Sequence, residues 1–224
     1  MIITIDGPTA SGKSTIGRLI AQKLHYYYLY SGLLYRALAY LLMQQYGYAR
    51  DHLMHPTLSH VYNILELNHM RYHFDPKTGE HIYFKGNDIT SFLKVNDVDQ
   101  AASIISTHKK VREVINKIQK DIASHADNII IDGRDAGTVV FPHANLKFYL
   151  TAVLSERARR WQLAQQEKGK DVSFEDALQS LKERDLRDKC RIHDPLTIAH
   201  NAIIIDTTQL TIDAVVAMII KYIN

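Results

Sequence analysis

Near-continuous apolar runs along the chain alternate with stretches in which apolar residues recur at helical spacing. The runs cover residues 2–5, 128–132, 146–150 and 202–206. The helical patterns cover residues 110–123, 155–167, 173–188 and 211–222. A run without alternation is typical of a strand buried on both faces of a parallel sheet. Strands that alternate with helices therefore predict a doubly wound α/β fold, whose phosphate ligands bind at the carboxyl ends of the strands.

The segment from about His69 to Val95 breaks this rhythm. Residues 72–89 alternate in hydrophobicity, and turn signals such as Asp75-Pro76 interrupt them. This pattern predicts a small antiparallel meander inserted into the α/β core. The tyrosine-rich residues 26–30 predict a partly buried strand after the first helix rather than a surface on which bases stack.

The residues after the first apolar run match a phosphate-binding loop. They contain the pattern GxxxxGKS, and the strand and helical pattern on either side disfavour an ordinary glycine-rich turn. The glycines let backbone N–H groups turn inward around phosphate oxygens, and the helix N-terminus adds partial positive charge. Lys13 is expected to reach the β- and γ-phosphates of ATP, and the Ser14 hydroxyl is expected to ligate Mg²⁺. The candidate ATP-binding residues are Gly7, Pro8, Thr9, Ala10, Ser11, Gly12, Lys13, Ser14 and Thr15.

A second informative region follows the run at 128–132. Because this strand ends in a carboxylate, Asp132 is expected to lie close to the phosphate loop and to act on the Mg²⁺ shell. Gly133 permits a sharp turn that presents Arg134 and Asp135 to the cleft, one suited to a phosphate and the other to a hydrogen-bond donor. Taken alone, an adjacent Arg and Asp also fit an ordinary surface pair.

Composition favours a small globular enzyme that binds a polyanionic small molecule. The net charge of +3 is too small to indicate a nucleic-acid partner, yet basic residues are dense at 108–112 and 184–191. The single Cys190 excludes an intramolecular disulfide and a cysteine zinc site. His69 and His73 have helical spacing but lack a carboxylate in a zinc pattern.

The same features predict a cytoplasmic protein. The lone thiol fits a reducing compartment, and the loop at Gly7 leaves no room for a signal peptide ahead of the first strand. The apolar run at 214–220 is far shorter than the roughly 20 residues that a membrane span requires. We therefore expect neither a nucleic acid nor a membrane as partner.

Six segments of the chain appear in the order in which they occur in bacterial cytidylate kinases, and the resemblance extends over essentially the whole chain. The segments are residues 7–15, 31–36, 101–103, 111–113, 132–142 and 182–185. The resemblance implies a P-loop nucleoside monophosphate kinase fold: a parallel sheet flanked by helices, a β insert in the acceptor-binding subdomain, and a helical lid. The implied reaction converts ATP and CMP or dCMP into ADP and CDP or dCDP, with Mg²⁺, within pyrimidine nucleotide metabolism.

The resemblance also assigns roles by position. The set implied for the acceptor phosphate is Ser31, Arg36, Arg134 and Arg191. The set implied to face cytosine is Ser103, Arg112 and Asp135, while Arg184 and Asp188 lie at the sugar or phosphate. Several cations are needed because two phosphorylated substrates must approach each other in line. The catalytic residues implied are Lys13, Arg134, Arg157, Arg160, Arg184 and Arg191, with Ser14 and Asp132 at the metal.

The resemblance divides a single kinase domain, residues 1–224, into three parts. The core covers 1–35, 108–155 and 190–224, the acceptor subdomain about 36–107, and the lid about 156–189. Lid closure is expected to bring some of Arg157, Arg159 and Arg160 over the transferring phosphoryl group and to exclude water. Spacing does not show which arginine does so. A lid-closing kinase of this kind is expected to be a monomer.

Some positions depart from the family pattern. Tyr30 stands where the family usually has the aspartate of Asp-Ser-Gly, so a carboxylate near the acceptor site is missing. Asp194 stands where serine or alanine is more usual before Pro-Leu. Asn201 replaces the usual aspartate just before a strand, which indicates a turn effect.

Two other classes of protein fit parts of the sequence. One is another small-molecule kinase with the same loop, such as a UMP/CMP, shikimate or adenylate kinase; the meander and the cytosine set distinguish it. The other is a nucleotide-dependent switch or a nucleic-acid-binding ATPase. The sequence contains no Asn-Lys-x-Asp guanine motif, and its net charge is low.

Overall fold

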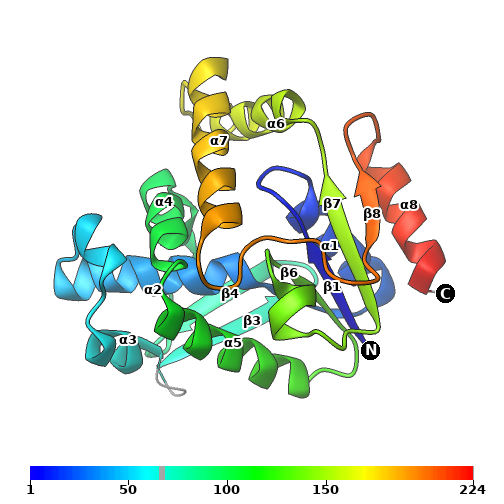
Figure 1. Ribbon diagram of the computed structural model, residues 1–224. Coiled ribbons are helices and arrows are strands. Elements are labelled where there is room, and N and C mark those ends of the chain that lie inside the picture. Colours follow the sequence, from blue (N-terminus) through cyan, green and yellow to red (C-terminus); the bar gives the residue numbers. More distant parts are fainter. Residues whose placement is uncertain (66–68, 224) are drawn as a thin grey trace.

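A parallel sheet forms the centre of the protein, with helices on both faces (Figure 1). In the computed structural model, which describes residues 1–65 and 69–223, the strands lie in the order β2-β6-β1-β7-β8. These strands are β1 (Ile2–Asp6), β2 (Tyr27–Tyr30), β6 (Ile129–Asp132), β7 (Leu146–Thr151) and β8 (Ile203–Asp206). Each neighbouring pair is parallel. The predicted α/β fold is confirmed.

The four predicted helical patterns correspond to α5, α6, α7 and α8. The helices of the described residues are α1 (Lys13–Leu24), α2 (Ser31–Tyr46), α3 (Leu58–Leu65), α4 (Asn96–Ile105), α5 (Lys109–Ser124), α6 (Leu154–Gln166), α7 (Phe174–Cys190) and α8 (Ile212–Ile223). Shorter helical segments are Asp51–Met54, Thr90–Lys94 and Ala136–Val140. None of the described helices is long and apolar enough to cross a membrane.

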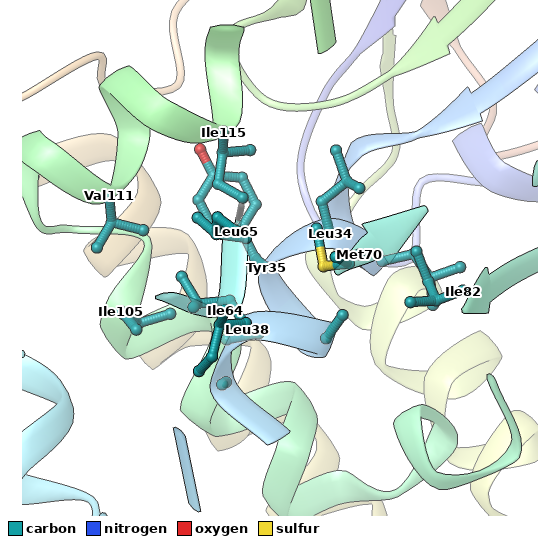
Figure 2. Close-up of a cluster of buried hydrophobic side chains, with 14 of the residues drawn as sticks. Leu34, Tyr35, Leu38, Ile64, Leu65, Met70, Ile82, Ile105, Val111 and Ile115 are labelled. Carbon is teal, nitrogen blue, oxygen red and sulfur yellow. The ribbon is translucent and has the colours of Figure 1, made fainter. Parts of the chain in front are cut away.

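The apolar runs are buried on both faces, as their lack of alternation predicts. On β6, Ile130 packs in one cluster with side chains of β1, α1 and α8, whereas Ile129 and Ile131 belong to a second cluster with α2 and α5. Figure 2 shows the second cluster, in which Leu34 and Leu38 of α2 lie among side chains of α3, the meander and α5. The sheet is therefore held between two apolar layers.

The predicted meander is confirmed as an antiparallel sheet of β3 (Met70–Asp75), β4 (Gly79–Phe84) and β5 (Asn87–Asp88). It is anchored to β2 by aromatic contacts, because the Phe74 ring meets the edges of Tyr27 and Tyr28 at centroid distances of 5.9 and 5.7 Å. Arg18 of α1 also donates two hydrogen bonds to Glu80 of β4, at 2.8 and 2.9 Å. The tyrosine-rich segment is a strand with Tyr28 fully buried, as predicted.

Two helices, α6 and α7, pack against each other above the carboxyl edge of the sheet (Figure 1). Ala158, Ala177 and Leu181 form a small apolar core between them. The hydroxyl of Ser173 accepts a hydrogen bond from the Asp176 N–H and caps α7. The strand register sets the site below them, because Ile5 and Tyr30 both lie opposite Asp132.

Candidate active site

The phosphate loop follows β1 and ends at the first turn of α1. Gly7 has φ +146°, and a Cβ there would lie 2.0 Å from the carbonyl oxygen of Leu150, so no other residue fits. Gly12 has φ +95° and precedes Lys13, the first residue of α1. The loop therefore leads directly into the N-terminus of α1, where unpaired backbone N–H groups and the helix dipole favour an anion.

Lys13 folds back over this loop. Its ammonium donates to the carbonyl oxygen of Pro8 at 2.6 Å and to the Ser11 hydroxyl at 3.4 Å. Burial, reinforced by the charge of Arg134, lowers the pKa of Lys13 to about 7. A nucleotide phosphate would supply the anion that this buried amine lacks.

The loop lines a donor cavity of about 880 Å³, the size of a typical ligand site. Of the predicted ATP-binding residues, those from 9 to 15 line this cavity, whereas Gly7 and Pro8 do not. Helix α6 contributes Arg160 and Trp161 to the lining. Further lining residues are Tyr30, Arg36, Asp99, Asp132, Arg134 and Arg184.

Asp132, at the end of β6, faces the donor cavity together with Ser14. Tyr28 donates to its Oδ2 at 3.1 Å, whereas the buried Oδ1 has no hydrogen-bond partner among the described residues. Burial raises the pKa of Asp132, and the charge of Lys13 opposes this. The described residues contain no cluster of three or more His, Cys, Asp or Glu suited to a metal. One free carboxylate oxygen and one hydroxyl still fit Mg²⁺, which keeps several waters and takes its other ligands from phosphates.

A buried carboxylate that the sequence analysis missed, Asp6, fixes the turn after Asp132. Its two oxygens accept hydrogen bonds from the N–H groups of Ala136 at 2.9 Å and Gly137 at 2.7 Å. Burial raises the pKa of Asp6 to about 7. The turn that presents Arg134 and Asp135 is thereby tied to the end of β1. The sequence offered a signal for Asp6, because β1 ends in this carboxylate just as β6 ends in Asp132.

A second, acceptor cavity adjoins the first beside α2, α4 and α7. All nine residues predicted to bind CMP line it: Ser31, Arg36, Ser103, Arg112, Arg134, Asp135, Arg184, Asp188 and Arg191. Its volume is about 50 Å³, far below the roughly 300–1,000 Å³ of typical ligand sites. Arginine–carboxylate pairs line it, namely Arg112–Asp135, Arg134–Asp188 and Arg191–Asp135.

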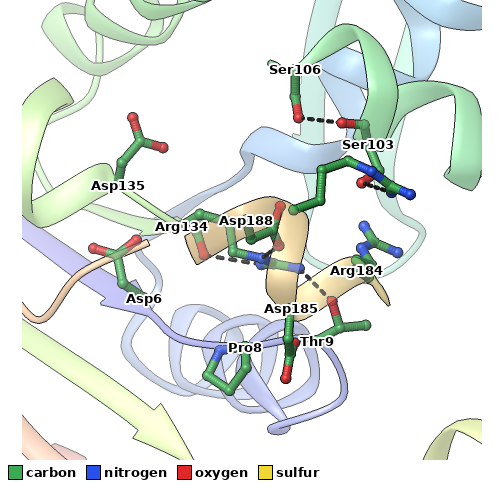
Figure 3. A network of polar contacts seen from close by, with 12 residues as sticks. Asp6, Pro8, Thr9, Ser103, Ser106, Arg134, Asp135, Arg184, Asp185 and Asp188 are labelled. Carbon is green, nitrogen blue, oxygen red and sulfur yellow. Dashed lines mark hydrogen bonds and ion pairs between the residues drawn. The ribbon is translucent and has the colours of Figure 1, made fainter. Parts of the chain in front are cut away.

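Arg134 connects the two cavities. It donates through Nε to Asp188 at 2.9 Å and through Nη2 to the Thr9 hydroxyl of the phosphate loop at 3.1 Å (Figure 3). Arg36 pairs with Asp99 at 2.5 Å, and Arg184 pairs with the other oxygen of the same carboxylate. Three cations therefore line both cavities at the point where they meet.

Arg112 is buried within a network of acceptors. It pairs with Asp135 through Nη2, with Asp194 through Nε at 2.7 Å, and with the carbonyl oxygen of Ser106 through Nη1 at 3.0 Å. Arg191 contacts the other oxygen of Asp135 at 3.4 Å and the carbonyl oxygen of Asp194 at 2.7 Å. Such a network fixes the planes of both guanidinium groups.

The two predicted serines of the acceptor set differ in their partners. Ser31 donates to the carbonyl oxygen of Asp132 at 2.7 Å. The Ser103 hydroxyl accepts a hydrogen bond from Arg187 at 2.7 Å, and the Ser103 carbonyl oxygen accepts one from Ser106 at 2.9 Å. Arg187 was not predicted; it lies in the last turn of α7, four residues before Arg191, which follows the end of that helix.

The three lid arginines have three different environments. Arg157 is buried, donates to the carbonyl oxygens of Ala152 and of Thr9 in the phosphate loop, and pairs with Asp185 of α7 at 2.8 Å. Arg160 lines the donor cavity and donates to Thr207. Arg159 points outward, with 66% of its side chain exposed. Within the described chain, Arg157 lines neither cavity.

The departures from the family pattern also have structural consequences. Tyr30 lines both cavities, and the guanidinium of Arg36 lies 5.8 Å from its ring centroid. Asp194 adopts φ +52° and pairs with Arg112, which lines the acceptor cavity. Asn201 adopts φ +61°, which agrees with the predicted turn effect.

Two adjoining cavities, one built on a phosphate loop and both lined by cations, suit a transfer between two phosphorylated molecules. By fold and site this protein is a P-loop kinase. A family model described as cytidylate kinase matches residues 3–224. The chain is 38% identical to cytidylate kinase from Actinobacillus succinogenes, over 100% of this chain and 98% of that protein. It is 38% identical to cytidylate kinase 1 from Haemophilus influenzae, over 100% of this chain and 94% of that protein. The chain therefore belongs to the cytidylate kinase family of phosphotransferases, as the resemblance indicated.

Proposed function

We propose that this protein transfers the γ-phosphoryl group of ATP to the phosphate of CMP or dCMP, giving ADP and CDP or dCDP. The observation that carries the proposal is the meeting of the two cavities at Arg36, Arg134 and Arg184. A donor phosphate on the loop and an acceptor phosphate in the second cavity would face each other across these cations. Family membership supports the same pair of substrates.

Charge stabilisation and alignment account for the chemistry. The loop N–H groups and Lys13 would hold the β- and γ-phosphates, while Arg134, which already contacts the loop at Thr9, would span donor and acceptor. The attacking oxygen belongs to a phosphate that is already ionised, so no general base is required. Ser14 and Asp132 would hold Mg²⁺. The ion, when bound, would neutralise charge on the phosphates.

The base would be recognised by the network around Arg112. Cytosine presents an amino donor at position 4 and an acceptor at N3, whereas uracil presents the opposite pair. Asp135 or the Ser103 hydroxyl would accept from the amino group, and Arg112 would donate to N3. Uracil would leave these groups unpaired, which costs on the order of a hundredfold in kcat/KM.

Helices α6 and α7 would act as the lid. Arg160 of α6 already lines the donor cavity, and Arg157 joins α6 both to the phosphate loop and to α7. Closure would bring Arg160 toward the transferring group and exclude water, which prevents ATP hydrolysis. The monomeric state and the cytoplasmic location expected from the sequence stay predictions.

A coupled assay of ADP release tests the proposal directly. The purified protein is incubated with ATP, Mg²⁺ and one of CMP, dCMP, UMP, AMP or GMP. We expect CMP and dCMP to exceed the others by about a hundredfold in kcat/KM. Equal turnover of UMP would reduce the assignment to a general nucleoside monophosphate kinase, and turnover of none of the five would refute it.

A further inference from the structure

One carboxylate that lines the donor cavity beside Arg36 and Arg184 has no role in the reaction described above. Asp99 lies in the first turn of α4, and its side chain is 17% exposed. One oxygen pairs with Arg36 of α2 at 2.5 Å and the other pairs with Arg184 of α7. Although burial opposes ionisation, Arg184 and Arg36 hold the pKa of Asp99 well below its usual range. A single negative charge therefore serves two cations.

Arg36 and Arg184 are the two cations that would bind an acceptor phosphate. Arg36 and Arg184 line both cavities, and so stand where donor and acceptor would meet. The Nε of Arg184 is buried and has no hydrogen-bond partner among the described residues. Asp99 thus satisfies this guanidinium only in part. A phosphate has three oxygens and up to two negative charges, so it can satisfy both guanidinium groups and the free Nε.

The small volume of the acceptor cavity points in the same direction. At about 50 Å³ it is too small for a nucleotide, so side chains that line it, Arg36 and Arg184 among them, must move when an acceptor binds. The Asp99 pairs span three helices, α2, α4 and α7 (Figure 1). Their exchange for a phosphate would remove one link between α4 and the lid helix α7 and leave the Arg187–Ser103 hydrogen bond as another.

We propose that Asp99 is a positioning residue that takes the place of the acceptor's phosphate on Arg36 and Arg184 in the free enzyme, and thereby sets the affinity for the phosphorylated acceptor. This inference rests on the proposed function. Asp99 keeps both arginines paired in the free enzyme and competes with the phosphate of CMP for them. Removing its charge should therefore strengthen acceptor binding, whereas removing an ordinary structural contact would weaken it.

The test compares Asp99→Asn with wild type in calorimetric binding of CMP and of cytidine, which lacks the phosphate. We expect the dissociation constant for CMP to fall about tenfold and that for cytidine to stay unchanged, because only the phosphate competes with Asp99. The KM for CMP should fall in parallel. Asp97→Asn is the matched control: it removes a charge from the same first turn, but the Asp97 side chain is 77% exposed, and its one ion pair among the described residues is with Arg50, at 3.3 Å.

Unchanged or weaker CMP binding by Asp99→Asn would overturn the inference, as would an equal change for cytidine. Failure of wild type to phosphorylate CMP would instead overturn the proposed function, and the inference with it. If Asp99→Asn does not fold, a crystal structure of wild type with CMP decides. Separation of Arg184 from Asp99, with its Nε on a phosphate oxygen, supports the inference; an intact Arg184–Asp99 pair beside a bound phosphate refutes it.

Discussion

Replacement of Asp6 by asparagine should abolish a specific pH dependence of stability. Asp6 is buried at the end of β1, and its pKa rises from the ordinary 3.8 to about 7, chiefly because burial disfavours its charge. A folded-state pKa above the unfolded one means that the native protein retains a proton that the unfolded chain has released. The stabilising contribution of Asp6 is thus fully present below pH 3.8 and is lost as the pH rises toward 7.

The magnitude follows from the two pKa values. Each pH unit between them changes the free energy of unfolding by about 1.4 kcal/mol, so the loss from pH 5 to pH 7 is about 2 kcal/mol once partial titration near pH 7 is included. The pKa of Lys13 is also about 7, but there it is lowered from the ordinary 10.5. Lys13 therefore changes the free energy of unfolding mainly above pH 7. Asp132, whose pKa burial raises, and His108, whose pKa burial lowers, also titrate in this range, so Asp6 is isolated by the difference between wild type and Asp6→Asn.

The assay is urea unfolding of ligand-free wild type and Asp6→Asn at half-unit steps across this interval. We expect the free energy of unfolding of wild type, relative to the variant, to fall by about 2 kcal/mol as the pH rises. Asp121→Asn, at an exposed position on α5, controls for the loss of one charge. A constant difference between wild type and Asp6→Asn would refute the reasoning, because it would mean that Asp6 is ionised throughout.

Three further predictions concern the reaction. Lys13→Ala should lower kcat/KM by several orders of magnitude in a protein with unchanged circular dichroism, and near-wild-type turnover would contradict the loop assignment. Residues 155–170 should gain hydrogen-exchange protection when CMP and a non-hydrolysable ATP analogue are both bound, and unchanged exchange there would exclude a lid in this segment. Arg112→Met should reduce kcat/KM for CMP more than for UMP; equal losses would show that Arg112 does not read the base.

The sequence predicted the sheet, the meander and four of the helices because each carries a clear periodic signal. The buried strand β6 reads as a run without alternation, and α5 has apolar residues on one face only. Helix α2 lacked that signal. Its buried residues include Leu33, Leu34, Tyr35 and Ala39, so they cover more than half of the helix circumference instead of forming a narrow stripe.

The candidate site was predicted in residue type but not in its pairing. The nine residues that the family motifs predicted for the acceptor line one cavity. No spacing rule, however, indicates that Asp99 pairs with Arg36 or that Asp194 pairs with Arg112. Those partners are separated by 63 and 82 residues in the chain. Long-range pairing of this kind depends on how α2, α4 and α5 pack, which local patterns do not encode.

These pairings set stability and acceptor binding against each other. Breaking a buried pair by removing one partner typically costs about 3–5 kcal/mol, so Arg36, Arg112 and Arg184 need internal carboxylates while no substrate is present. On the inference above, Asp99 must yield when a phosphate arrives, and every gain in its affinity for Arg36 and Arg184 is subtracted from the affinity for the acceptor. Substitutions that tighten the Asp99 pairs should therefore stabilise the free protein and raise the KM for CMP together, the trade-off expected of a site that remains folded while empty.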